Sequence, residues 1–128
     1  MNPASTRTRP KHLDLVKIRL PVPGVVSILH RISGAGLFLM LPFLLYLLQL
    51  SLQAPDTYVV FRGVFANPLV KLLLIGLLWA FLHHFCAGIR YLVLDMHIGT
   101  ELPAARSSSY AVLVVSLVMT VLLGVWLW

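Results

Sequence analysis

The sequence has 128 residues, of which 59% are hydrophobic and only 11% are charged, and its formal net charge at pH 7 is +6. Three apolar stretches are long enough to cross the roughly 30 Å hydrocarbon core of a bilayer, and too little chain remains for a soluble domain. Six basic residues precede the first apolar stretch instead of forming a patch typical of nucleic-acid binding, which excludes that partner: Arg7, Arg9, Lys11, Lys17, Arg19 and Arg31.

Residues 1–26 form a basic segment that we expect to lie on the cytoplasmic side of the membrane. Residues 12–20 alternate apolar with charged side chains, and Pro21 and Pro23 then end any regular element. Cytoplasmic segments of membrane proteins carry an excess of Lys and Arg, so the basic cluster predicts a cytoplasmic N-terminus. A three-helix transmembrane domain is predicted over residues 27–128.

The first predicted span covers about residues 30–52, and three polar residues lie at its start. Ser27, His30 and Arg31 have the spacing i, i+3 and i+4, so they share one face of a helix. This set could bind a quinone head group or the propionates of a haem, because Arg pairs with carboxylates in a forked geometry. The alternative is an ordinary anchor in which Arg31 extends to lipid phosphates.

The second predicted span, about residues 68–94, follows a connection punctuated by Pro55 and Pro68, in which a short interfacial helix is expected over residues 58–65. This span contains His84, and a buried imidazole in hydrocarbon is costly enough to indicate a functional site. Steps of four residues from His84 reach positions with almost no side chain: Gly76, Ala80 and Gly88. Such a row leaves room for a haem, although an interhelical hydrogen bond is the competing reading.

The other histidines are predicted to differ from His84 in direction or in depth. His83 is turned about 100° away on a helix, so we expect it to be a hydrogen-bonded histidine of the core or of a subunit interface. His12, His30 and His97 are expected at or beyond the cytoplasmic boundary, not level with His84. A second axial ligand for a haem iron should therefore come from another chain.

The third predicted span covers about residues 108–128, and Ser107, Ser108 or Ser109 is expected to cap its start. Trp126 and Trp128 should then lie at the periplasmic interface, where amphipathic rings are favoured. At the cytoplasmic end of the second span lie Arg90 and Asp95, which indicate either cytoplasmic anchors or, for Arg90, a partner of a cofactor carboxylate.

Two motifs resemble a known family. Residues 27–34 read Ser-x-x-His-Arg-x-Ser-Gly, and residues 84–90 read His-x-x-x-Gly-Ile-Arg. Together with Asp95 and the three spans, they resemble the cytochrome b membrane-anchor subunit of succinate dehydrogenase, respiratory complex II. The resemblance implies an all-α integral membrane fold with three transmembrane helices, forming half of a heterodimeric haem-binding bundle in the bacterial inner membrane.

The resemblance also implies roles for four residues. His84 matches the axial ligand of the iron in a haem b that is shared with a second membrane-anchor subunit. His30 and Arg31 match positions near the haem propionates, and Ser27 and Arg31 match residues of the quinone site. One position departs from the family, because Tyr91 stands where His is frequent, and a tyrosine can donate a hydrogen bond but cannot accept a proton near neutral pH.

The implied function is to dock the flavoprotein and iron–sulfur subunits and to form part of the site where electrons from succinate reduce ubiquinone. Succinate itself would be oxidised in the other subunits. Two alternatives remain open at this stage. One is a fumarate reductase anchor, and the other is a structural or transport subunit without haem, whose histidines only make interhelical hydrogen bonds.

Overall fold

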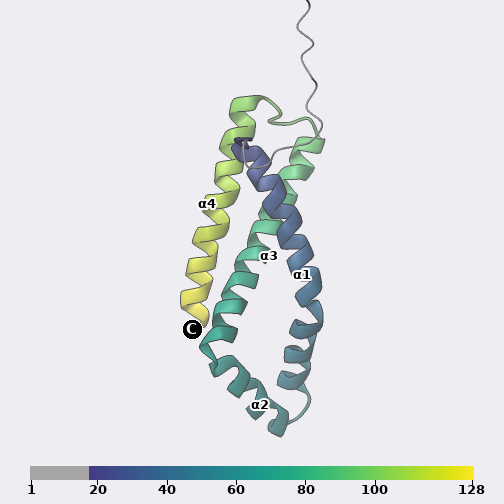
Figure 1. Cartoon of the computed structure of the whole chain (residues 1–128), viewed down its shortest axis with the longest axis vertical. Helices are drawn as coiled ribbons and strands as arrows, with labels where there is room; N and C mark the ends of the chain where they lie inside the picture. Colours follow the sequence, from purple (N-terminus) through teal and green to yellow (C-terminus); the bar gives the residue numbers. More distant parts are fainter. Residues whose placement is uncertain (1–17) are drawn as a thin grey trace, which may run out of the picture.

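The computed structural model describes residues 18–128 and shows four helices with no strand in that range. The helices are α1 (Val22–Leu52), α2 (Pro55–Ala66), α3 (Pro68–Asp95) and α4 (Leu102–Leu127). Three of them, α1, α3 and α4, are long and apolar enough to cross a membrane. Figure 1 shows these three running side by side, with α2 joining α1 to α3 at one end. The prediction of an all-α membrane protein is confirmed.

Each helix has a proline within its first two positions: Pro23, Pro55, Pro68 and Pro103. Proline suits this place because its fixed φ is helical and the first N–H groups of a helix have no internal partner. In α3 the side chain of Asn67 adds a cap, since its Oδ1 accepts a hydrogen bond of 2.9 Å from the Leu69 N–H.

The predicted serine cap of the third long helix was wrong. α4 begins at Leu102, so the serines 107–109 lie inside the helix and cap nothing. Pro103, at the second helical position, favours this earlier start. The three hydroxyls instead donate to carbonyl oxygens of their own helix, at Ala104 and Ala105. A serine inside a helix can satisfy its hydroxyl by donating to the carbonyl three or four residues before it.

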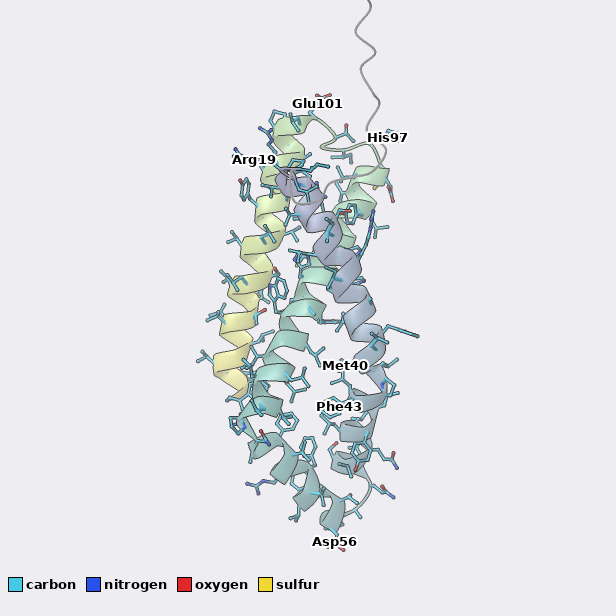
Figure 2. All side chains as sticks on the ribbon, in the orientation of Figure 1. Arg19, Met40, Phe43, Asp56, His97 and Glu101 are labelled. Carbon is cyan, nitrogen blue, oxygen red and sulfur yellow. The ribbon has the colours of Figure 1, made fainter. Side chains whose placement is uncertain are left out.

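The interfacial helix expected near residues 58–65 is present as α2. Its aromatic side chains form a row that continues to the end of α4, with ring centroids 5.8 Å apart for Tyr58–Phe61, 4.8 Å for Phe61–Phe65 and 5.9 Å for Phe65–Trp128. We call these four residues the aromatic row. The row connects α2 to α4, and Figure 2 shows Asp56, at the start of α2, at the extreme end of the bundle.

The interior of the bundle is small and contains many polar groups. Its apolar cluster, formed by Val26, Ala87 and Val112, joins α1, α3 and α4. Large apolar side chains point outward instead, such as Phe38, which is 74% exposed. On α4 the buried face carries three hydroxyl groups, here called the hydroxyl stripe: Ser109, Ser116 and Thr120. Such a distribution suits lipid, where small residues let helices approach closely and apolar surface needs no burial.

Candidate functional site

The side chain of His84 points from α3 to the backbone of α1. Its Nδ1 lies 3.0 Å from the carbonyl oxygen of His30 and 3.3 Å from Oγ of Ser33. A carbonyl can only accept, so Nδ1 carries the proton and donates it to His30. Nε2 is therefore left with a free lone pair. It makes no hydrogen bond to any residue from 18 to 128, and it is not among the buried atoms of that range.

The ring of His30 lies flat against the ring of His84. The two ring centroids are 4.0 Å apart and the ring planes differ by 13°. His30 also touches Tyr91, whose ring centroid is 5.2 Å away, and its Nδ1 is buried without a hydrogen-bond partner. These contacts contradict the prediction that His30 and His84 lie at different depths. The prediction failed because the sequence of each helix does not reveal the axial register in which α1 packs against α3.

Glycine at position 34 allows His84 to approach α1 this closely. A Cβ atom added to Gly34 would lie 2.7 Å from Cε1 of His84, which is too close, and 3.2 Å from its Nδ1, which is a tight contact. The row of small residues on α3, Gly76, Ala80 and Gly88, is covered by a neighbouring helix at one end only. A Cβ at Gly88 would meet His30 at 3.8 Å, whereas one at Gly76 would meet nothing within 4 Å. The row is thus covered by α1 near His84 and open further along α3.

His83 is completely buried, as expected for a core residue. Its ring lies 5.3 Å from that of Trp79, at an interplanar angle of 30°. The ring faces the backbone of Val26, but neither ring nitrogen forms a hydrogen bond of good geometry among the described residues. The sequence gives the direction of the side chain from the helical period, but it does not reveal which groups of the neighbouring helices face it.

Ser27 and Arg31 do not join the contact between the two histidine rings. Arg31 is exposed, Ser27 is half-buried, and neither side chain forms a hydrogen bond within residues 18–128. Arg31 follows His30 by one residue and is therefore turned about 100° from it around α1. Of the residues predicted to form the site, the structure brings His30 and His84 into contact and leaves Ser27 and Arg31 beside them with free polar groups.

Arg90 is buried and directed to α4, which sequence reasoning missed. Its Nε donates to Oγ of Ser108 at 2.9 Å, and its Nη2 donates to the carbonyl of Ala105 at 3.2 Å. The guanidinium also lies 5.5 Å from the ring centroid of Tyr91. Arg90 therefore ties the first turns of α4 to α3, and its guanidinium is engaged there. Asp95, the other residue considered with it, is exposed.

The remaining histidines are not part of this arrangement. His97 is exposed in the connection between α3 and α4, with a φ of 61°, and His12 lies outside the described residues. Figure 2 shows His97 at the same end of the bundle as Arg19 and Glu101, far from Asp56. In the part of the chain that the structure describes, no cluster of three metal-ligating side chains occurs.

Comparison with known proteins agrees with this architecture. Residues 5–123 match the family model described as succinate dehydrogenase/fumarate reductase transmembrane subunit. A relative from Coxiella burnetii is 41% identical over 121 residues, which cover 94% of this chain and 97% of the relative. Relatives from Rickettsia felis and Paracoccus denitrificans are each 32% identical over 114 residues; these cover 89% of this chain and 87% and 88% of the respective relative.

All three relatives carry the name succinate dehydrogenase cytochrome b556 subunit. The match extends over nearly the whole chain, including the three long apolar helices. The chain is therefore a multi-pass membrane protein that belongs to the family of succinate dehydrogenase and fumarate reductase transmembrane subunits.

Proposed function

We propose that this chain is a haem b-bearing anchor of succinate dehydrogenase, with Nε2 of His84 as an axial ligand of the iron. The observation that carries the proposal is the hydrogen bond from Nδ1 of His84 to the carbonyl of His30. Metal-ligating histidines almost always donate their second ring N–H to a carbonyl or carboxylate, which fixes the tautomer and the ring orientation. The relatives' name, cytochrome b556, supports the same cofactor.

The contact with His30 is compatible with a ligand role for His84. An imidazole coordinates through a lone pair in the plane of its ring, and His30 covers only one flat face, so the edge with Nε2 stays free. The same geometry excludes His30 as the opposite ligand. The two rings are stacked face to face and nearly parallel, so His84 would hold the iron without His30. The second ligand then comes from a second membrane-anchor subunit.

Ser27 and Arg31 are proposed to hold the head group of ubiquinone. Arg31 is exposed and offers a forked, permanently charged donor, and Ser27 lies one turn before it on α1 with a free hydroxyl. A bound haem would supply a one-electron redox centre beside this site. His30 and Arg31 would lie near its propionates, where the exposed Arg31 could pair with a carboxylate as a cation.

The complex would contain a flavoprotein subunit and an iron–sulfur subunit docked at the end of the bundle that carries Arg31. We place that end in the cytoplasm of a bacterial inner membrane and the α2 end in the periplasm, because the basic residues precede α1. Electrons from succinate would reach ubiquinone there, with protons taken up from the cytoplasm. A fumarate reductase anchor is the second candidate, since the matching family description covers both enzymes.

The proposal predicts a haem spectrum and a quinone activity in one preparation. The intact complex, purified through a tag on this chain, should show the reduced-minus-oxidised spectrum of a low-spin b-type haem in stoichiometric amount. It should also reduce ubiquinone with succinate. A complete, active complex without haem would instead identify this chain as a structural anchor, and a complex that only reduces fumarate with a low-potential quinol would favour the second candidate.

Gly34 provides a test of how His84 is positioned. Gly34→Ala places a methyl group 2.7 Å from Cε1 of His84, so the ring must move and its hydrogen bond to His30 must weaken. We expect a several-fold lower haem content or a shifted haem spectrum in the assembled complex. Gly36→Ala is the matched control on the same helix, because its added Cβ meets nothing within 4 Å. Equal, native spectra in both variants would contradict this positioning role.

A further inference from the structure

We propose that the α2 end of the bundle contains a binding site for one anionic phospholipid. Two neighbouring cavities form the site. The first has a volume of about 290 Å³ and an apolar wall that includes Leu44, Leu77 and Phe81. The second has a volume of about 430 Å³ and is lined by Arg62 and Lys71 together with aromatic and small residues.

The two cavities adjoin because three residues line both of them: Phe65, Leu127 and Trp128. Phe65 and Trp128 are the last pair of the aromatic row, with ring centroids 5.9 Å apart. An elongated ligand that passes this pair can therefore have one end in the basic cavity and the other in the apolar one. The combination matches the shape of a phospholipid, with a head group at one end and an acyl chain at the other.

The fold explains why space exists at this end. Figure 1 shows that α1 and α3 separate toward α2, which spans the distance between them. The first cavity has walls from α1, α2, α3 and the end of α4, and the second has walls from α2, α3 and the end of α4. Both are grooves that open to the outside of the bundle and are bounded by side chains of more than one helix.

The positive charges in the second cavity favour an anionic ligand. Arg62 belongs to α2 and Lys71 to the first turn of α3, and no acidic side chain of the described chain lines either cavity. Arg binds a phosphate group through paired N–H donors and Lys binds it as a point charge, so the two side chains suit a phosphate-bearing head group. Free phosphate would occupy only the basic cavity and leave the apolar one empty. The head group of a quinone is neutral, so the charges of Arg62 and Lys71 do not favour it. The aromatic row also marks the depth of the membrane interface, where head groups lie.

Trp128 allows the site to be observed directly by fluorescence. The purified complex, delipidated in detergent, is titrated with brominated phosphatidylglycerol and, separately, with brominated phosphatidylcholine, since bromine quenches a tryptophan that it touches. The signal of Trp128 is the difference between wild type and Trp128→Phe. We expect saturable quenching by phosphatidylglycerol with an affinity roughly thirtyfold above that for phosphatidylcholine, as two cations at a membrane surface imply.

Two double variants test the role of charge. Arg62→Gln with Lys71→Gln should abolish the preference for phosphatidylglycerol, whereas Arg62→Lys with Lys71→Arg should keep it. Arg106→Gln, which removes an exposed cation at the other end of the bundle, should have no effect. Assembly is checked by gel filtration and by the haem spectrum, which should be native in every variant because His84 is not involved.

Three results would overturn the proposal. Equal quenching by both lipids would show ordinary membrane contact without a site. A preference that survives the double glutamine variant would show that Arg62 and Lys71 serve another partner, such as a carboxylate of the chain itself. Absence of quenching, or displacement of the brominated lipid by equimolar short-chain ubiquinone, would assign the cavities to a partner subunit or to the quinone.

Discussion

Replacing His84 with alanine should remove the low-spin, bis-histidine haem spectrum from the assembled complex. The expected loss is essentially complete, because no other imidazole in residues 18–128 offers a free lone pair in the same place: the His30 ring lies parallel to that of His84 and 4.0 Å from it. The measurement is the reduced-minus-oxidised absorption spectrum, supported by low-temperature electron paramagnetic resonance of the oxidised haem.

His83→Ala is the matched control for this experiment. His83 precedes His84 by one residue, but it packs on Trp79 in the core and has no access to the surface of the chain. Its spectrum should remain bis-histidine even if the complex is less stable. A native spectrum in the His84→Ala complex would refute the ligand assignment. Residual haem with an altered spectrum would not, since water or another side chain can occupy a vacated coordination position.

Replacing Arg31 with leucine should lower ubiquinone reduction by succinate about tenfold to a hundredfold. The guanidinium would donate a charge-assisted hydrogen bond to the quinone, and such bonds contribute roughly 1.5–3 kcal/mol. Ser27→Ala should have a smaller effect, because it removes a neutral hydrogen bond worth about 0.5–1.5 kcal/mol. Oxidation of succinate with a soluble acceptor that takes electrons before the quinone should keep its wild-type rate in both variants.

The comparison of the two activities separates a quinone site from a docking surface. If both activities of Arg31→Leu fall together, the defect lies in the contact with the other subunits. If assembled variants reduce ubiquinone at the wild-type rate, Arg31 is a lipid anchor, which is the alternative that the sequence left open. Arg106→Leu serves as the control, because Arg106 is also exposed and lies in the first turns of α4.

The sequence predicted the number and the kind of helices because a membrane span needs a long apolar run, and hydropathy detects such a run without knowledge of contacts. The short helix α2 was also predicted, since Pro55 and Asn67 mark its two ends. The family motif directed attention to His84, and His84 is the residue whose Nδ1 the structure shows bonded to a backbone carbonyl.

Contacts between helices were harder to predict, because they depend on the axial register of one helix against another. His30 and His84 were predicted at different depths, although their rings are stacked with centroids 4.0 Å apart. Arg90 was read as an anchor or a cofactor partner, although its guanidinium reaches Ser108 and Ala105 of α4. The three consecutive serines 107–109 could have indicated a partner for Arg90. They were instead interpreted as a helix cap.

The hydroxyl stripe of α4 has a consequence for the way sequences of this family can change. In a water-soluble protein the large apolar positions of the core tolerate substitution least. Here Ser109 and Ser116 are fully buried, while apolar residues such as Val125 face outward and are 77% exposed. An added methyl group between α3 and α4 must push the helices apart, whereas an outward valine can become any apolar residue. Mutational tolerance should therefore be highest at the most hydrophobic positions and lowest at the small polar ones.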